Sequence, residues 1–436
     1  MKYLFMVVLI LMFTGCLSKN IKVKKDIEDL KNIPQDVRFY TKNIDVNVSN
    51  QDIRQRYEKL YFRVWNIDTP PEKVQNIQWP FRAYTIHNSY GENFQPLNQS
   101  FFDKMYENSN FNAYGTLNKK AIALGHLNMR GFPTVQPLIK DPSIAGEGFP
   151  FDYLQNSTVS ANKPLFVSHY SIDGEWVYVF SSFTSGWVKS NEIAFLDKQY
   201  TDLWQQAKQV LITKENISLF SNEGNFLFKS KIGMMLPLID ENDNDYTVLT
   251  ITAYKNSQPI YLQTSVSKKI ASKEILTFSK DNIDNIISEI AASNYGWGGM
   301  YNQRDCSSTL RDQFAVFGIW LPRNSSQQSR VGKVVSLENL TDEEKINLIK
   351  KEAIPFQTLL YKRGHIVLYV GTYEDQIIIF HNAWGIKTKK DGVKGRVVVG
   401  KSIFSTLKLG KEQEDYDEDG EILRNLKSMN ILTGNH

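Results

Sequence analysis

Cysteine is scarce in this sequence, with only two among 436 residues, Cys16 and Cys306. The chain therefore cannot hold a framework of several disulfides, although an exported protein could still join these two. Neither cysteine belongs to a Cys-x-x-Cys pair, and no His-Glu-x-x-His motif is present. Both common spacings of a zinc site are thus excluded, and we expect neither a metal nor a cofactor.

A large excess of charge of either sign is also missing. The 51 Lys and Arg residues nearly balance the 47 Asp and Glu residues, which leaves a formal net charge of +4. No basic stripe with interleaved aromatic residues is present, so nucleic acid is not an expected partner. The apolar content is that of a folded protein, and at ~100–200 residues per domain the length predicts three or four modules. We expect a monomer.

Long hydrophobic runs are confined to the N-terminus. Residues 3–13 are nearly all apolar, which is too short for a membrane span of ~20 residues but typical of a signal peptide, predicted here over 1–15. Thr14 and Gly15 before Cys16 resemble a bacterial lipobox. The resemblance implies cleavage before Cys16, acylation of that cysteine, export, and anchoring on the periplasmic side of a membrane. The outer membrane is one destination, because no Asp follows the cysteine; an unlipidated secretory signal is the alternative.

The residue pattern of the remaining chain changes between helical and strand-like segments, which predicts an α+β multi-domain protein. Short alternating strands separated by turns predict two small β-barrels, and an isoleucine pattern of helical spacing predicts a helix over 279–292. The acidic turn 240–245 lacks the glycine and glutamate of a calcium loop, so it is expected to be a hairpin. The predicted segments are a polar tether over 16–35, a helical region over 36–117, β-barrels over 118–200 and 201–277, and an α+β domain over 278–436.

Cys306 has the setting of a nucleophile. It follows the glycine-rich stretch 295–299 and lies at the start of a helix expected over 305–317. A helix N-terminus stabilises an anion, so we expect a lowered thiol pKa there. If Cys16 carries lipid, Cys306 has no disulfide partner, and an unpaired cysteine in an exported protein indicates catalysis. Taken alone, a buried core thiol would be an equally good interpretation.

Two histidines supply the imidazoles that such a thiol needs. His365 opens an expected strand, and His381 ends the next one. Antiparallel neighbours would bring these strand ends together, with His365 as the base and His381 as the residue that orients it. Each histidine alone could be structural, but the order and spacing of all three residues favour a catalytic site.

These motifs resemble the NlpC-type family of papain-like bacterial peptidoglycan peptidases over about 280–409. Upstream, residues 125–134 and 186–188 resemble the first bacterial SH3 module of multi-domain members, and 36–115 resembles their N-terminal stabilising region. The resemblance implies two SH3-like β-barrels followed by a papain-like α+β catalytic domain. It implies a D,L-endopeptidase that cuts the γ-D-glutamyl bond to diaminopimelate or Lys in stem peptides of peptidoglycan or muropeptides, through Cys306, His365 and His381.

The resemblance also implies roles for neighbouring residues. Tyr295 would assist the oxyanion hole together with the Cys306 backbone N–H, and Asp305 and Ser307 would shape the substrate groove. The sequence departs from the family at Ser308, where glycine is usual; we expect this serine to tighten the start of the helix.

Three other functions are compatible with the sequence. One is a muropeptide-recycling peptidase that requires a free N-terminal L-Ala, whose amine would meet Tyr170, Tyr178 and the Asp305 carboxylate. A second is a non-catalytic wall-binding lipoprotein, which an intact set of catalytic side chains argues against. A third is an amidase or acyltransferase on the same fold, because the stem-peptide assignment rests on family resemblance.

Overall fold

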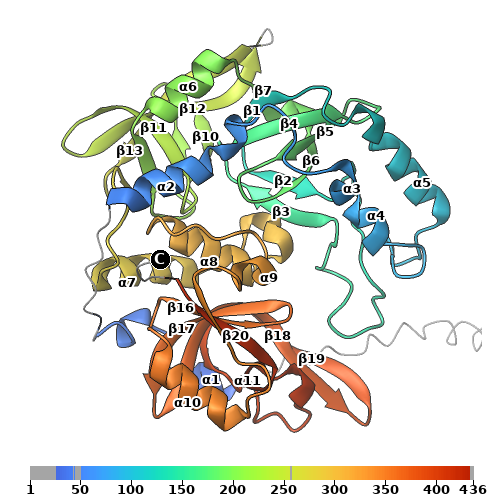
Figure 1. Ribbon diagram of the computed structural model, residues 1–436, viewed down its shortest axis with the longest axis vertical. Helices are drawn as coiled ribbons and strands as arrows, with labels where there is room; N and C mark the ends of the chain where they lie inside the picture. Colours follow the sequence, from blue (N-terminus) through green and yellow to red (C-terminus); the bar gives the residue numbers. More distant parts are fainter. Residues whose placement is uncertain (1–25, 43, 45–50, 256–257, 433–436) are drawn as a thin grey trace, which may run out of the picture.

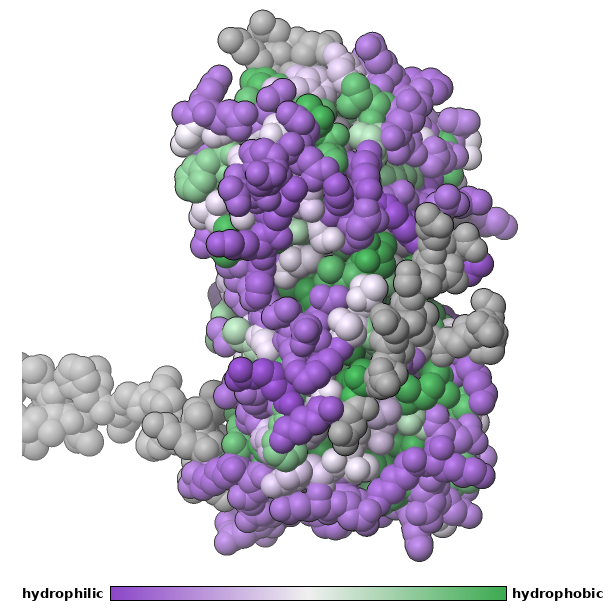
Figure 2. Space-filling view, turned by 90° about the vertical axis from the view of Figure 1, so that its left-hand side faces the viewer, coloured by the Kyte–Doolittle hydropathy of each residue, from purple (hydrophilic) through white to green (hydrophobic). Residues whose placement is uncertain are grey.

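The computed structural model describes residues 26–42, 44, 51–255 and 258–432 (Figure 1). In the view of Figure 1, two β-domains lie above, the antiparallel sheet of the C-terminal domain lies below, and helices of the C-terminal domain lie between them. The face shown in Figure 2 is largely hydrophilic, with apolar residues in small patches. Cys16 falls outside the described residues.

Short helices form the N-terminal region and pack against both the C-terminal domain and the first β-domain. The Trp65 indole N–H donates to the carbonyl of Ala121, 2.9 Å away, and ties this region to the first β-domain. Its elements are α1 (Glu28–Asn32), η1 (Val37–Phe39), α2 (Gln51–Tyr61), η2 (Arg63–Trp65), α3 (Val74–Ile77), α4 (Trp79–Ala83), α5 (Gln99–Asn108) and η3 (Phe111–Ala113).

The tether expected over 16–35 is wrong for its last part. Ile27 is buried, and the Asp29 carboxylate accepts the backbone N–H of Thr406 at 2.7 Å. Gln35 exchanges two hydrogen bonds with the backbone of Phe404. Residues from Ile27 onward are therefore docked on the C-terminal domain. The prediction failed because alternating charges in this segment conceal an apolar and hydrogen-bonding face.

The first β-domain is an antiparallel sheet with strand order β3-β2-β6-β5-β4-β1-β7. The side chains on both faces of β5 are buried, among them those of its valines, tryptophan and phenylalanine, as expected for the wall of a small barrel. The elements are β1 (Lys119–Ala123), β2 (Leu127–Arg130), β3 (Gln155–Val159), β4 (Pro164–Tyr170), β5 (Trp176–Phe180), β6 (Ser185–Lys189), η4 (Ser190–Glu192) and β7 (Ile193–Phe195).

The second β-domain follows α6 (Lys198–Gln206) and has strand order β13-β12-β11-β8-β14, with β9 and β10 paired separately. The acidic turn joins β11 to β12, so the predicted hairpin is confirmed. The strands are β8 (Gln209–Ile212), β9 (Ser218–Phe220), β10 (Phe226–Lys229), β11 (Met235–Glu241), β12 (Asp245–Lys255), β13 (Gln258–Ser267) and β14 (Ala271–Ser272).

The C-terminal domain packs helices on an antiparallel sheet of order β15-β20-β16-β17-β18-β19. The predicted helix over 279–292 is confirmed as α7, with Ser279 as its N-cap. The elements are α7 (Lys280–Ala291), η5 (Trp297–Asn302), α8 (Cys306–Ala315), α9 (Ser325–Gln328), β15 (Lys333–Ser336), α10 (Asp342–Glu352), β16 (Thr358–Lys362), β17 (His365–Tyr373), β18 (Gln376–Lys390), β19 (Val393–Thr406), η6 (Glu418–Gly420), α11 (Ile422–Asn425) and β20 (Leu426–Ile431).

One hydrophobic core crosses all of these boundaries. It joins Tyr61 of the N-terminal region, Phe166 and Met235 of the two β-domains, and Phe314 of α8 with Phe380 of β18. Helix α8 is therefore held on several sides, which fixes the position of its first residue, Cys306.

Candidate active site

Helix α8 begins at Cys306, and a capping box defines that start. The Asp305 carboxylate accepts the backbone N–H of Ser308 at 2.9 Å, and the Ser308 hydroxyl accepts the backbone N–H of Asp305 at 2.9 Å. The expectation that Ser308 tightens the helix start is confirmed. The helix ends at Ala315, two residues before the predicted end.

Arg323 holds this cap from the other side, a partner that sequence reasoning missed. Its guanidinium donates to the Asp305 carboxylate at 2.6 and 3.2 Å and to the Ser307 hydroxyl at 2.9 Å. Burial acts to raise the pKa of Asp305, but the charge and hydrogen bonds of Arg323 outweigh it and hold that pKa below its usual value. No local motif connects residues 305 and 323, so only the fold reveals this pair.

The Asp305 carboxylate, which the muropeptide hypothesis assigns to a free amine, is thus already paired with Arg323. Tyr178 is buried and donates to the Ser185 hydroxyl at 3.1 Å. Tyr170 and Tyr178 are absent from the described residues that line the two arms of the cleft at Cys306. The structure therefore does not bring Tyr170 and Tyr178 to the cleft beside Asp305, and contact of these residues with a substrate amine stays a prediction.

His365 and His381 meet across the β17–β18 pair, as predicted. Nε2 of His365 lies 2.8 Å from Nδ1 of His381. His365 opens β17, but His381 lies in the middle of β18 rather than at a strand end. The predicted strand end is wrong because β19 pairs with β18 through and beyond His381, which stands opposite Ile403.

The hydrogen bonds beyond His381 determine the tautomers of both rings. The Ser405 hydroxyl donates to the Thr406 carbonyl at 3.0 Å, so it accepts from Nε2–H of His381, 3.0 Å away. Nδ1 of His381 must then accept Nε2–H of His365. Nδ1 of His365 is left with a free lone pair, which is the form that a general base needs. Ser405 stands 24 residues from His381 without a recognisable motif, and the sequence did not reveal it.

Both imidazoles are neutral at physiological pH. Burial lowers the pKa of His381 to about 3, and the nearby Lys362 ammonium adds to this effect. Burial, then His381 and Lys362, hold the pKa of His365 well below its usual value.

The thiol differs from the expectation. Burial, and then the Asp305 carboxylate, raise the pKa of Cys306 to about 12, although the backbone N–H groups of Ile366 and Ser307 act in the opposite direction. The helix N-terminus alone does not decide the ionisation, because loss of water around the sulfur outweighs it. Cys306 and His365 line the same arm of the cleft, and they are thus a neutral thiol and a neutral imidazole.

The cleft at Cys306 has two arms. The histidine arm, about 280 Å³ in volume, contains His365 and His381, and it is walled by residues that include Phe151, Trp384 and Arg396. The aspartate arm contains Asp305 and Ser307, with Arg323 beside them. Both arms share Tyr153, Tyr295, Trp297, Cys306 and Gly364.

Tyr295 lines the shared part of the cleft together with Cys306. Burial raises the pKa of its phenol well above the usual value, and the charges of Asp305 and Cys306 raise it further. The phenol therefore remains protonated and able to donate.

The glycine-rich loop that follows Tyr295 is docked on the first β-domain. The Trp297 indole donates to the Asp152 carbonyl at 2.9 Å, and the Gln155 amide donates to the Gly298 carbonyl at 3.2 Å. Gly298 has a φ of +58°, and any Cβ there would overlap the Gln155 backbone. The first β-domain thus forms one wall of the cleft.

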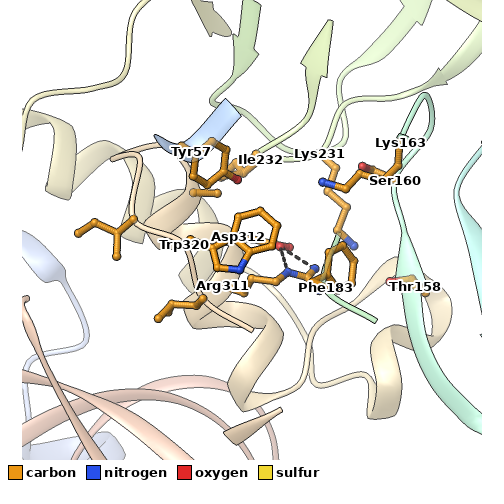
Figure 3. A pocket seen from close by; sticks show the side chains of 14 residues that line it. Tyr57, Thr158, Ser160, Lys163, Phe183, Lys231, Ile232, Arg311, Asp312 and Trp320 are labelled. Carbon is orange, nitrogen blue, oxygen red and sulfur yellow. Dashed lines mark hydrogen bonds and ion pairs between the residues drawn. The ribbon is translucent and has the colours of Figure 1, made fainter. Parts of the chain in front are cut away.

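A cluster of buried charges lies on the other side of α8 (Figure 3). Asp312 accepts from Arg311 at 2.8 and 3.0 Å, as Figure 3 shows. It also accepts from Arg304 at 2.8 Å. Lys163 and Lys231 reach this pocket from the first and second β-domains. Arg304 also forms an ion pair with Glu215 at 2.5 Å, so the cluster links α8 to the second β-domain.

Two absences hold for residues 26–42, 44, 51–255 and 258–432, which the structure describes. Within that part of the chain, no group of three or more His, Cys, Asp or Glu side chains is arranged to hold a metal ion. No helix there has the length and apolarity needed to cross a membrane.

Four family models match this chain. The model described as NLPC_P60 stabilising domain, N term, matches residues 5–114, and the NlpC/P60 family model matches 292–399. Between them, an SH3 domain of SH3b1 type matches 137–189 and an SH3 domain of SH3b2 type matches 197–242.

The chain is also similar to solved structures. The chain is similar to an NlpC/P60 endopeptidase from Photobacterium damselae subsp. piscicida, with 25% identity and a TM-score of 0.79 over 92% of this chain and 97% of that one. An NlpC/P60 family protein from Bacillus cereus ATCC 10987 shares 17% identity, with a TM-score of 0.44 over 64% of this chain and 82% of that one. A search of curated proteins found no significant match.

The fold and the matches define an α+β multi-domain protein with two SH3-like domains and a C-terminal NlpC/P60 domain. The chain belongs to the NlpC/P60 family, in the form that carries an N-terminal stabilising domain. Members of this family are generally cysteine peptidases that act on peptidoglycan, and this chain is accordingly a peptidoglycan hydrolase.

Proposed function

We propose that the protein is a D,L-endopeptidase that hydrolyses the γ-D-glutamyl bond to the diamino acid of peptidoglycan stem peptides. Cys306 is the nucleophile, His365 the general base and acid, and His381 the residue that orients His365. One observation carries this proposal, namely the chain of hydrogen bonds from Ser405 through His381 to His365 in the cleft that also holds Cys306.

The first half of the reaction begins from the neutral pair. Nδ1 of His365 takes the thiol proton of Cys306 as the sulfur attacks the γ-carbonyl carbon of D-Glu. The carbonyl oxygen gains a negative charge, which the Cys306 backbone N–H and the protonated Tyr295 phenol stabilise. The imidazolium that forms at His365 keeps its Nε2–H bond to His381.

The second half returns the enzyme to its starting state. His365 gives its proton to the leaving amine of the diamino acid, the C–N bond breaks, and a thioester with Cys306 remains. Water then loses a proton to His365 and attacks the thioester, which releases the D-Glu carboxylate and the Cys306 thiol. The net reaction consumes one water for each bond cut.

The cleft supports this substrate class through its shape and its walls. Both arms are open at Cys306, as a bond in the middle of a peptide requires, and aromatic side chains line the shared part. Asp305 and Ser307 line the aspartate arm, where they support its wall as a unit with Arg323.

Digestion of purified peptidoglycan, and separately of the tripeptide L-Ala-γ-D-Glu-diaminopimelate, tests the proposal by mass spectrometry of the products. We expect wild-type protein to release fragments that end in L-Ala-D-Glu, and the Cys306→Ala variant to release none. A neutral control, Ser402→Ala, changes a buried hydroxyl on β19 that has no hydrogen-bond partner among the described residues. Cleavage of the free tripeptide alone would favour the muropeptide-recycling function, and cleavage of neither would refute the endopeptidase.

We also propose that Cys16 carries a lipid that anchors the exported protein in a membrane. The apolar run and small residues before Cys16 support this proposal. Metabolic labelling with a fatty-acid analogue tests it, with Cys16→Ala as the control. Label that is retained in the variant, or absent from wild type, would contradict lipidation.

A further inference from the structure

We propose that the histidine arm of the cleft is a carboxylate-binding subsite that selects diaminopimelate over Lys in the leaving group. This inference rests on the proposed function and deepens it. It is carried by four cations on the wall of this arm, at Lys362, Arg363, Lys387 and Arg396.

The four cations have no counter-charge on that wall. Among the described residues that line the histidine arm, none is Asp or Glu. None of the four side chains forms an ion pair with any carboxylate in the described part of the chain. Lys362 donates only to the Gly420 carbonyl, at 2.9 Å. Burial lowers the pKa of Lys362 to about 8, and the charges of Lys387 and Arg396 contribute. A cleft that holds so much uncompensated positive charge attracts an anionic ligand group.

Arg396 is the cation best placed to recognise a carboxylate. Its Nε atom is buried and has no hydrogen-bond partner within the described residues. Burial lowers the pKa of its guanidinium, and only Glu147 and two tyrosines oppose this. Glu147 accepts from the Tyr153 hydroxyl at 2.6 Å and makes no ion pair with Arg396. A guanidinium whose planar fork has no protein partner can bind a carboxylate in bidentate fashion.

Two segments hold Arg396 in position. Arg396 lies on β19 opposite Lys387 of β18. Its guanidinium approaches Gly146 of the first β-domain so closely that a Cβ at residue 146 would overlap it. Gly146 has a φ of +84°, so both its backbone conformation and the close approach require glycine. The loop of the first β-domain therefore leaves room for this cation at the edge of the cleft.

The leaving group belongs in this arm for a chemical reason. The amine that departs must receive its proton from His365, so it lies beside the imidazole rather than beyond Cys306. His365 and His381 line the histidine arm but not the aspartate arm. Lys362 and Arg363 lie three and two residues before His365, where β16 turns into β17.

The two diamino acids differ in the group that reaches these cations. The side chain of meso-diaminopimelate ends in an ammonium and a carboxylate, whereas that of Lys ends in an ammonium alone. The cationic wall repels the Lys side chain and gains a hydrogen-bonded ion pair with diaminopimelate. A charge-assisted pair of this kind is worth enough to change the preference by about tenfold or more.

The test compares kcat/KM for two peptides, L-Ala-γ-D-Glu-meso-diaminopimelate and L-Ala-γ-D-Glu-L-Lys. We expect wild type to favour the diaminopimelate peptide by about tenfold or more, mainly through KM. In Arg396→Gln this ratio should fall about tenfold, with the Lys peptide little affected. Lys394→Gln removes a charge from the same strand but outside the lining of the arm, and should leave the ratio unchanged.

Binding of both peptides to the Cys306→Ala protein, with and without Arg396→Gln, gives a readout independent of turnover. Lys387→Gln serves as a second variant should Arg396→Gln fold poorly, as judged by thermal melting. Equal cleavage of the two peptides by wild type would overturn the inference and leave the endopeptidase intact. An unchanged ratio in both cleft variants would overturn it as well. Cleavage of neither peptide would remove the proposed function, and this inference with it.

Discussion

The Ser405 hydroxyl oxygen lies 3.0 Å from Nε2 of His381, on the side of the ring away from His365. Because this hydroxyl gives its proton to the Thr406 carbonyl, it can only accept from His381. One serine on β19 thus determines which nitrogen of each histidine carries a proton, and it leaves Nδ1 of His365 as the basic atom.

Replacing Ser405 by Ala should lower kcat about 10- to 100-fold while KM changes little, as when a group that orients a catalytic histidine is lost. Without its acceptor, His381 is free to carry the proton on Nδ1, which prevents His365 from presenting a lone pair to the thiol. Steady-state kinetics on the stem tripeptide measure the effect. The matched control is Ser402→Ala on the same strand. A kcat near that of wild type would show that Ser405 does not orient the pair.

Lys362 should control the acid limb of the pH profile. Activity requires neutral His365, and after burial and His381 the Lys362 charge is a further cause of its low pKa. In Lys362→Met that pKa rises, so the acid limb of kcat/KM against pH moves to higher pH. Lys333→Met removes an exposed cation from β15 and should leave the limb in place. An acid limb that stays in place or moves to lower pH in Lys362→Met would contradict the assignment.

Asp305 should keep the free thiol protonated. Its charge is the second cause, after burial, of the raised pKa of Cys306, so Asp305→Asn lowers that pKa. The rate of alkylation by iodoacetamide against pH reports the change. Asn still caps the helix, but Arg323 loses its partner, so the free energy of unfolding should fall by about 3–5 kcal/mol. A thiol pKa that stays the same or rises would refute this account.

Gly298 should be needed to dock the glycine-rich loop. In Gly298→Ala the new Cβ overlaps the Gln155 backbone, which displaces the loop that carries Tyr295 and Trp297. We expect a lower melting temperature and a higher KM. Gly174→Ala provides the control, since Gly174 also has a positive φ, +72°, but has open space around it. Equal effects in both variants would mean that backbone strain, not the contact, matters.

Asp312 should anchor α8 to the second β-domain through Arg304. Removing its carboxylate in Asp312→Ala leaves Arg311 without its carboxylate partner and Arg304 with Glu215 alone, at a cost of about 3–5 kcal/mol in unfolding free energy. Burial acts to raise the pKa of Asp312, but Arg311 and Arg304 hold it well below its usual value. Its contribution is therefore present above pH ~4, the pKa of an unfolded Asp, and is lost as pH falls through the lower folded value.

Denaturant titration at several pH values measures the contribution of Asp312. The difference between wild type and Asp312→Ala should shrink toward acid pH. Asp375→Ala, in the exposed pair with Lys350, should cost under about 1 kcal/mol. A similar loss in both variants would show that burial of the cluster is unimportant.

Local patterns in the sequence were sufficient for the elements that carry the chemistry. Ser279 and its isoleucines predicted α7, and the residues before Cys306 predicted the start of α8 to within one residue. The pairing of His365 with His381 followed from two adjacent strands. Each of these inferences depends on neighbours within about 20 residues, where helix capping and strand alternation act.

The same patterns failed where distant segments meet. The middle position of His381 in β18 depends on pairing with β19, and docking of residues 27–35 depends on the far edge of the same sheet. A lowered thiol pKa was inferred from the helix N-terminus alone, whereas burial by the assembled domains has the larger effect.

The sequence by itself determined the side chains that are proposed to react, their order and the helix and strands that present them, because the helix and strands depend on local backbone preferences. Only the tertiary structure decided their protonation states, the Arg323 and Ser405 partners, and the cationic wall of the histidine arm. These properties depend on which charges, hydroxyls and water molecules share a small volume. Desolvation and Coulomb interactions act through space, and no spacing along the chain encodes them.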